Sequence, residues 1–339
     1  MAKARRLKRR KRRSRRWIFP LALFVLLAAG YAGVHAFFRP LEQKPGGRPD
    51  VVQTQGSSHT QNPSEDLTDK EAEALRSHYE RKDSFYTILV AGTDGGGGNS
   101  DTNILVAVDA ANGSIYGVSI PRDTKARING KNYKINAAYA LGGMELLADV
   151  ISDQLGIPVD YTVSVDLRGF RALVDAIDGV DFYIPINMDY DDPVQNLSIH
   201  FSKGMRHLTG AEALKVVRFR HNNDGSGYGS EDIGRMQTQQ DFLKAVAKKI
   251  LTPASLTKLD DFVKIFQQYV ETDLNLGNLA WLGGEAISIG SDGIDFSTLP
   301  GNWKSPYIYL DLSETLAVVN QHLNPYVEDR LPEDLNVPN

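Results

Sequence analysis

Two aspartates lie on either side of a run of four glycines, in a segment that reads GTDGGGGNSDT. Glycine lets a backbone approach a ligand closely, and Mg²⁺ prefers one or two protein carboxylates together with phosphate oxygens and water. Asp94 and Asp101 therefore suit a magnesium site that a phosphorylated substrate completes. The segment is not a nucleotide P-loop, because it lacks a Gly-Lys-Ser/Thr ending and leads into a strand. Taken alone, the simpler interpretation is that both aspartates cap turns.

Arginines and a glutamine downstream have the chemistry of a phosphate-binding site. If the backbone of VVRFRH is extended, the side chains of Arg218 and Arg220 share one face. Arg235 and Gln239 lie four residues apart on a predicted helix, with Asp232 one turn earlier, so they share a face too. Each guanidinium offers a paired donor fork to phosphate oxygens and keeps its charge. The alternative is a solvated basic face, or ion pairs within an acidic domain.

A third candidate is the pair Arg122-Asp123, which ends a predicted strand in SIPRDT. Strand ends commonly build sites, although a lone Arg-Asp pair is more often an ordinary surface ion pair. His207 and His221 stand beside no recognisable nucleophile, and we expect both to be structural. The sequence has neither a Gly-x-Ser-x-Gly elbow nor a His-Glu-x-x-His helix, which argues against serine hydrolases and zinc peptidases. Phosphate chemistry is the best fit.

The elements that must position these residues alternate between strand and helix. Hydrophobic runs predict strands at FYTILVAG, TNILVAVD and SIYGVSI, the last two joined by Asn112-Gly113, a type I′ hairpin signal. Further strands are expected at residues 160–166, 180–185 and 293–299, and helices at residues 136–155, 167–177, 209–217, 232–251, 259–270, 276–289 and 313–322. This alternation predicts an α/β domain.

The amino terminus predicts export. Residues 1–16 hold 11 of the 38 Lys+Arg and none of the 42 Asp+Glu. The rest of the chain therefore has a formal net charge of 27 − 42 = −15. Residues 17–38 contain no Asp, Glu, Lys or Arg, and 22 residues can cross a hydrocarbon core of about 30 Å as a helix. The basic residues keep the amino terminus inside. A cleaved signal peptide ending near Val34-His35-Ala36 is the competing interpretation, and both interpretations place the domain outside the cytoplasm.

Six motifs, in order, resemble the LytR-CpsA-Psr family. They are GTD with SDTNILVAVD, SIPRDT, KINAAYALGG, LGIPVDYTVSVDLRGFRALVDAIDGVDF, HLTGAEALKVVRFRH and DIGRMQTQQDFLKA, all within residues 84–252. The resemblance implies an α/β domain with a central mixed β-sheet and helices on both faces, preceded by one N-terminal transmembrane helix. It also implies a phosphotransferase that moves a glycopolymer, such as teichoic acid or capsule, from undecaprenyl pyrophosphate onto peptidoglycan through a phosphodiester. An apolar tunnel would hold the prenyl tail.

Carried over by motif, the resemblance also implies roles for single residues. The metal ligands for Mg²⁺ would be Asp94 and Asp101. The pyrophosphate-binding residues would be basic or amide side chains: Arg122, Lys134, Arg218, Arg220, Arg235 and Gln239. Three residues would act in the reaction itself: Asp123, Asp232 and Arg122. Either of these two aspartates could accept the proton of the attacking sugar hydroxyl, and the sequence leaves both open.

One position departs from the family pattern. Asn99 stands where the family usually has arginine, so one phosphate-binding charge is missing. Lys125 or Arg127 could compensate, or the pyrophosphate could be bound more weakly. Cysteine is absent, which excludes disulfides, thiolate nucleophiles and cysteine metal ligands.

We therefore expect five segments along the chain. They are a cytoplasmic basic tip at residues 1–16, a transmembrane helix at 17–38, a tether with a lead-in helix at 39–82, an extracytoplasmic catalytic domain at 83–325 and a C-terminal tail at 326–339. The expected partners are a polyprenyl-pyrophosphate-linked glycan, a peptidoglycan acceptor and the membrane.

Three other functions compete with the transferase. A non-catalytic scaffold that binds polyprenyl-linked intermediates would keep the arginines but would not need Asp94 and Asp101. A pyrophosphatase would use water in place of the sugar acceptor. A transcriptional regulator is disfavoured, because the basic tip adjoins a predicted membrane span and the remainder of the chain is negatively charged, so we expect no nucleic-acid partner.

Overall fold

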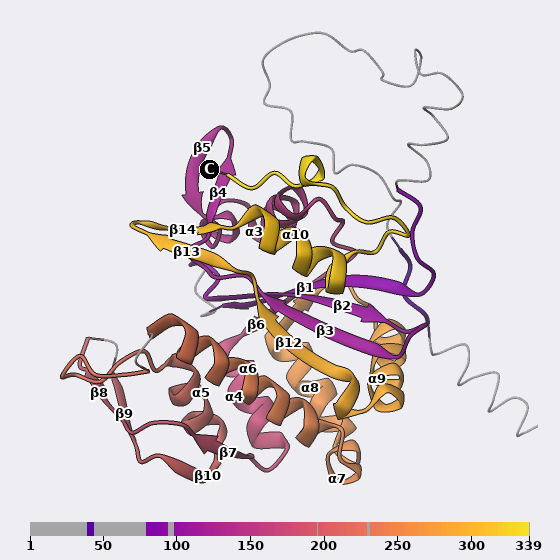
Figure 1. Ribbon diagram of the computed structural model, residues 1–339. Coiled ribbons are helices and arrows are strands. Elements are labelled where there is room, and N and C mark those ends of the chain that lie inside the picture. The colour runs from indigo at the N-terminus through magenta and orange to yellow at the C-terminus, as the bar shows by residue number, and fades with distance from the viewer. Residues whose placement is uncertain (1–38, 44–78, 94–97, 195, 229–230, 339) are drawn as a thin grey trace, which may run out of the picture.

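The computed structural model describes residues 39–43, 79–93, 98–194, 196–228 and 231–338 (Figure 1). The predicted transmembrane helix, most of the predicted tether and Asp94 lie outside these ranges. Within them, no helix is both long enough and apolar enough to cross a membrane.

A six-stranded mixed sheet forms the centre of the domain, with the strand order β11-β6-β1-β2-β3-β12. Its strands are β1 (Phe85–Thr93), β2 (Thr102–Asp109), β3 (Ser114–Ser119), β6 (Tyr161–Asp166), β11 (Val270–Thr272) and β12 (Ile294–Thr298). β1 pairs parallel to β6 and antiparallel to β2, and β12 pairs parallel to β3. β1 is buried along most of its length, as expected of a strand whose two faces are both covered. The predicted α/β fold with a central mixed sheet is confirmed.

Helices cover both faces of this sheet. They are α3 (Ala137–Leu155), α9 (Leu276–Ile289) and α10 (Leu312–Val318). α8 (Leu259–Tyr269), with the short α7 (Pro253–Leu256) before it, instead packs against a second hydrophobic core through Phe262. α3 and the turn that follows α10 pack on the face that presents Leu89 and Val118. α9 packs on the opposite face, where Trp281 meets the Tyr86 ring edge-on at 5.5 Å between centroids. We call the sheet with these two covering layers the sheet lobe.

A second hydrophobic core lies apart from the sheet, in what we call the helical lobe. Its helices are α4 (Leu167–Ala176), α5 (Gly210–Arg218) and α6 (Glu231–Ile250). Its strands form two antiparallel pairs: β7 (Val180–Ile184) with β10 (Gly204–Leu208), and between them in the chain the hairpin of β8 (Met188–Asp192) and β9 (Leu197–Phe201). Phe219 and Phe242 are fully buried in this core. Figure 1 shows the helical lobe below the sheet, with α6 running beside β12.

Two short hairpins complete the sheet lobe. They are β4 (Lys125–Ile128) with β5 (Lys131–Lys134), and β13 (Gly301–Lys304) with β14 (Tyr307–Leu310). A π-helical turn at Val319–Leu323 extends α10, and single 3₁₀ turns occur at Ser291–Gly293 and Pro332–Asp334.

Two details differ from the sequence-based expectations. Asn112-Gly113 does join β2 to β3, but not as a type I′ turn, because only Gly113 has a positive φ, 66°. The Asp109 carboxylate instead accepts bonds from the backbone and side-chain amides of Asn112. The helix expected at residues 136–155 is interrupted where Gly142 and Gly143 leave helical φ/ψ values.

Candidate active site

One edge of the central sheet gathers the ends of β3 and β12 and the start of β2. The register shows this directly, because Ser119 of β3 pairs with Ile104 of β2 and with Thr298 of β12. Asp101 precedes β2 and Arg122 follows β3, so both residues lie at this edge. The Arg122 guanidinium donates to the Asp101 carboxylate at 2.7 Å, and 34% and 48% of the two side chains are exposed.

The base of the glycine loop is closed by a backbone bond, in which the N–H of Asp101 donates to the carbonyl of Gly92 at 2.9 Å. Ser100 and Asn103 beside it are fully buried, and their side chains have no hydrogen-bond partner among the described residues. Unsatisfied buried polar groups are uncommon in proteins. Sequence reasoning missed both residues, although Asn103 is the one amide within the apolar run of β2.

Arg122 and Asp123 form a fixed turn between β3 and β4. The Arg122 carbonyl accepts from the N–H of Asn136 at 3.2 Å, and the Asp123 carbonyl accepts from the N–H of Ile308 on β14 at 2.9 Å. The Asp123 carboxylate pairs with Lys134 at 2.8 Å, and 24% of that aspartate side chain is exposed. The predicted Lys134 thus lies beside the predicted base, and a hairpin from the end of the chain supports the turn.

Arg220 brings the helical lobe to this same edge. Partial desolvation lowers the pKa of its guanidinium, and the positive charges of Arg122 and Arg235 lower it further. The negative charges of Asp101 and Asp123 act in the opposite direction. These four side chains, spread over more than 130 residues of the chain, therefore lie within electrostatic range of Arg220.

The backbone around the arginines is only partly extended, so the condition under which Arg218 and Arg220 would share a face is not met. Arg218 is the last residue of α5, and the chain becomes extended only at Phe219, with φ −63° and ψ 136°. The last turn of α5 is held in place because the Val216 side chain packs into the core of the helical lobe. Phe219 is fully buried, whereas Arg218 and Arg220 on either side of it are exposed.

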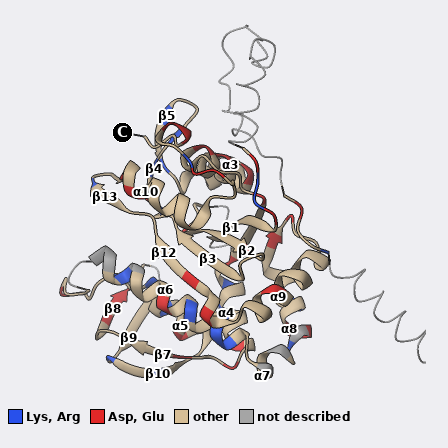
Figure 2. Cartoon of the chain, turned by 45° about the vertical axis from the view of Figure 1, so that its right-hand side comes forward, with Lys and Arg blue, Asp and Glu red and all other residues tan. Residues whose placement is uncertain are grey.

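Helix α6 positions Arg235 through two polar contacts with β12. The Gln240 side chain donates to Thr298 Oγ1 at 2.7 Å, and Lys244 pairs with Asp295 at 2.6 Å, one helical turn further on. Figure 2 shows the charges of α6 and β12 side by side. Because these contacts fix the helix along the strand, Arg235 is presented at the sheet edge.

Gln239 contacts the protein itself, because its side-chain amide donates to the carbonyl of Val217 at 2.8 Å. This bond ties α6 to the last turn of α5, immediately before the two arginines. Asp232 lies one turn before Arg235 on α6, as predicted, but the position of its side chain falls outside what the structure describes.

Tyr228 is a residue of the site that sequence reasoning missed. Burial raises the pKa of its phenol, and the positive charge of Arg235 acts in the opposite direction, so the ring lies near that arginine. A Cβ added at Gly234 would lie 2.5 Å from the Tyr228 Cβ. The glycine before Arg235 therefore provides the space that lets the tyrosine pack against α6.

The two histidines bond to protein groups. His207 pairs with Asp181 at 2.8 Å across the antiparallel strands β7 and β10. His221 Nδ1 lies 2.9 Å from the carbonyl of Asn222, and its ring meets Tyr190 edge-on. Each arrangement is a local contact within the helical lobe.

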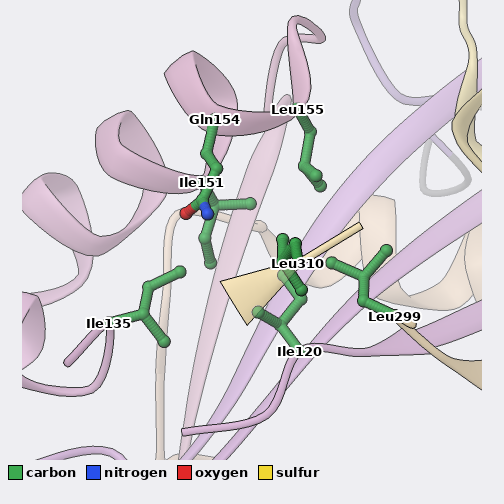
Figure 3. A pocket seen from close by; sticks show the side chains of 7 residues that line it. All are labelled: Ile120, Ile135, Ile151, Gln154, Leu155, Leu299 and Leu310. Carbon is green, nitrogen blue, oxygen red and sulfur yellow. The ribbon is translucent and has the colours of Figure 1, made fainter. Parts of the chain in front are cut away.

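An apolar channel for a prenyl tail is not formed by the void beneath the site. This void lies between α3, β14 and the ends of β3 and β12, and it is too small to admit a water molecule. Figure 3 shows its lining, which is aliphatic except for one amide: Ile120, Ile135, Ile151, Gln154, Leu155, Leu299 and Leu310. These side chains form part of the core that supports the Arg122-Asp123 turn.

The described carboxylates suit a magnesium ion that substrate would complete. No group of three or more His, Cys, Asp or Glu side chains within the described ranges could hold a metal unaided. Mg²⁺ in proteins commonly takes one or two carboxylates and fills its octahedron with phosphate oxygens and water. Asp101 offers one half-exposed carboxylate at the edge, and its predicted companion Asp94 falls outside the described residues.

Comparison with known proteins identifies relatives over most of the described chain. The sequence profile of the LytR_cpsA_psr family matches residues 50–324. The polyisoprenyl-teichoic acid–peptidoglycan teichoic acid transferase TagU of Bacillus cereus is 37% identical over 211 residues, which cover 61% of this chain and 66% of that protein. TagV of Bacillus subtilis, of the same description, is 33% identical over 189 residues, 54% of this chain and 47% of that one. The matched stretches thus span less than two thirds of these relatives.

Solved structures resemble the fold. The crystal structure of B. subtilis TagV superposes with a TM-score of 0.59 at 29% identity, covering 72% of this chain and 98% of that chain. A structure of TagT bound to LI-WTA gives a TM-score of 0.55 at 26% identity, with 70% and 88% coverage.

Proposed function

This chain belongs to the LytR-CpsA-Psr family, and we propose that it transfers a glycopolymer from a polyprenyl-pyrophosphate carrier to peptidoglycan, forming a phosphodiester. Relatives are named as teichoic acid transferases that use a polyisoprenyl-linked donor and peptidoglycan. The proposed substrate class is accordingly a teichoic acid or a similar polymer.

The observation that carries the proposal is the excess of positive charge at the sheet edge. Among the described side chains, four basic groups surround two carboxylates there, which leaves 4 − 2 = 2 positive charges. The chain after residue 16 sums to −15, so this local excess is not a reflection of overall composition. Repelling guanidiniums are stabilised by an anion between them, and a pyrophosphate offers oxygens that match their donor forks.

The reaction follows from that placement. A sugar hydroxyl of peptidoglycan attacks the phosphorus that bears the glycopolymer, the bond to the bridging oxygen breaks, and polyprenyl phosphate leaves. Arg122, Arg220 and Arg235 stabilise the charge on the transferring group, which is the main requirement of phosphoryl transfer. Asp123 or Asp232 accepts the hydroxyl proton; Asp123 is the one whose carboxylate is described, held beside Lys134 at 2.8 Å.

Magnesium is part of the proposal. Asp94 and Asp101 would hold the ion, which would neutralise charge on the pyrophosphate oxygens when bound. The pairing of Asp101 with Arg122 supports this assignment, because it places the carboxylate where a guanidinium also reaches the phosphate.

We further propose that residues 17–38 anchor the protein in the cell membrane and that the domain lies outside the cytoplasm. The support is the sequence: 22 residues without Asp, Glu, Lys or Arg follow a tip with 11 basic residues.

The test is an assay of purified full-length protein with Mg²⁺, a polyprenyl-pyrophosphate glycan and peptidoglycan fragments, in which mass spectrometry detects the phosphodiester-linked product. Arg220→Ala should slow its formation by about 10²- to 10³-fold, the usual cost of removing one group that stabilises a transition state. Arg171→Ala is the matched control, since Arg171 is 60% exposed and its pair with Asp175 is long, at 3.8 Å.

The assay separates the competing functions. Product formation at the wild-type rate by Arg220→Ala would overturn the proposed site. Release of phosphorylated glycan without attachment, at the same rate with or without acceptor, would identify a pyrophosphatase. Donor binding without either product would identify a scaffold.

A further inference from the structure

Helix α9 is apolar to an extent unusual for a helix on a protein surface. Its 14 residues, LGNLAWLGGEAISI, include one charged side chain, Glu285. Leu279, Trp281 and Leu282 pack inward against the central sheet. A helix that covers a core normally turns polar and charged side chains outward. The outward residues of α9 therefore need a separate explanation.

The outward face of α9 is uncharged and open. Leu276, Ala280, Gly283 and Ile287 follow one another at intervals of three and four residues, which places them along one side of the helix. Leu276 is 48% exposed and Ile287 is 49% exposed. A Cβ added at Gly283 would meet no atom within 4 Å, so nothing in the described part of the chain covers this side. Figure 2 shows α9 almost free of charge.

The segment that follows the proposed membrane span docks onto this same helix. The N–H of Arg39 donates to the carbonyl of Gly277 at 3.2 Å. The Asn278 side-chain amide donates to the carbonyls of Arg39 and Pro40, both at 3.1 Å. Leu41 is 5% exposed within the hydrophobic cluster beneath α9. These contacts fix the segment to the start of α9.

We propose that the outward face of α9 lies on the membrane surface and contacts lipid. The inference rests on the proposed anchor, residues 17–38, whose last residue is Phe38. Consecutive Cα atoms are about 3.8 Å apart, so the Cα atom of Arg39 lies within that distance of the last residue of the proposed span. The headgroup layer on each side of a bilayer is roughly 5–8 Å thick, and a helix is roughly 10 Å wide. A helix bound beside the end of the span is therefore wide enough to reach through this layer. The tether that we expected to begin at Arg39 does not separate the proposed span from α9, because residues 39–41 bind to that helix and to the cluster beneath it.

Membrane contact also accounts for the composition of the face. Apolar side chains at a bilayer interface lose contact with water, and surface-lying helices bind lipid through such a face. The opposite side of the sheet lobe offers a matched comparison, because α3 packs on the other face of the sheet and carries Leu141, which is 55% exposed. A leucine exposed there would remain in water.

Spin labels can locate the membrane directly, since the chain has no cysteine of its own. Leu276→Cys, Ile287→Cys and Leu141→Cys would each carry a nitroxide, in full-length protein held in nanodiscs of mixed zwitterionic and anionic phospholipid. Collision with oxygen, which concentrates in lipid, would be compared with collision with a water-soluble nickel chelate. Labels at 276 and 287 should show an oxygen-to-chelate ratio several-fold higher than the label at 141.

The outcomes distinguish the docking of α9 from the anchor itself. If the protein stays with the discs while all three labels show the same aqueous ratio, α9 does not lie on the membrane, although the span holds. If the protein does not co-purify with the discs, the anchor is wrong and the inference falls with it. If the label at 141 shows the lipid ratio and those at 276 and 287 do not, the opposite face of the sheet lobe faces the bilayer.

Discussion

Arg122 and Asp101 form an ion pair at 2.7 Å across the open end of the β2–β3 hairpin, one residue lying before β2 and the other after β3. Both side chains are partly exposed, 34% and 48%. Exposed ion pairs of this kind contribute at most about 1 kcal/mol to stability. The pair therefore matters mainly for placing a carboxylate and a guanidinium side by side at the site.

Asp101→Asn should raise the Mg²⁺ concentration required for half-maximal transfer by at least about 10-fold. The amide keeps the shape of the side chain but removes the negative charge that a hard cation prefers. The melting temperature should change little, because the pair is exposed. Asp109→Asn is the control at the other end of the hairpin, where Asp109 bonds to Asn112. An unchanged magnesium requirement in Asp101→Asn would remove this residue from the metal site.

Asn222→Ala should reduce transfer by about 10-fold and lower the free energy of unfolding by no more than about 2 kcal/mol. The Asn222 side chain accepts from the N–H of Asp189 at 2.6 Å and donates to Ser226 Oγ at 2.9 Å, so it ties the loop after Arg220 to β8. Each lost bond costs about 1 kcal/mol, and the freed loop would hold Arg220 less firmly. Steady-state kinetics and thermal unfolding check this together.

The matched control for this loop is Asn302→Ala, an exposed amide on β13. Transfer that falls equally in both variants would show that the Asn222 contacts do not act through Arg220. A large loss of melting temperature in Asn222→Ala alone would assign those contacts to folding.

Gly234→Ala should destabilise the protein by about 1–3 kcal/mol, the usual cost of overpacking. The added Cβ would lie 2.5 Å from the Tyr228 Cβ, within the helix that carries Arg235. Gly283→Ala is the opposite case on α9, where nothing lies within 4 Å, and removing a helical glycine should stabilise by up to about 1 kcal/mol. Chemical denaturation measures both. A stable Gly234→Ala variant would show that Tyr228 can shift without cost.

His322→Phe should make the protein less sensitive to acid. The His322 ring stacks on Tyr116 at 3.6 Å with planes 5° apart, and burial lowers its pKa below 6.5, against the opposing charge of Asp295. The unfolded chain therefore takes up a proton first as the pH falls below about 6.5, which favours unfolding. This contribution to stability is present above that pH and is lost as the pH falls toward the folded pKa.

Melting temperatures measured from neutral pH downward check this prediction. The wild type should lose stability more steeply than His322→Phe below about pH 6.5, because phenylalanine keeps the stack but does not titrate. Parallel curves for the two proteins would show that this imidazole does not contribute to acid lability.

Long, strongly patterned elements were predictable from the sequence. α9 spans Leu276–Ile289 as the apolar run predicted, and β2 spans Thr102–Asp109. The β8–β9 and β13–β14 hairpins were missed, because their strands have four or five residues and mix polar with aromatic side chains. Such short strands form only because tertiary neighbours pair with them or pack on them.

The site was predictable in its residue types but not in its supports. Repeated arginines in ordered motifs indicated an anion site, and the structure places Arg122, Arg220 and Arg235 within electrostatic range. The bond from Gln239 to the carbonyl of Val217 could not be predicted, because it depends on how α6 crosses the end of α5. The condition that Arg218 and Arg220 both lie on extended backbone is not met, because the helix predicted to Val217 continues through Arg218.

The division of the domain into two lobes has a mechanical consequence. Arg122 belongs to the sheet lobe, whereas Arg220 and Arg235 belong to the helical lobe, and the repulsion between these guanidiniums acts across the boundary. This repulsion opposes the contacts that hold α6 of the helical lobe along β12 of the sheet lobe. A bound diphosphate would offset this repulsion and contact both lobes at once, so the relative placement of these guanidiniums would depend on the ligand as well as on the fold.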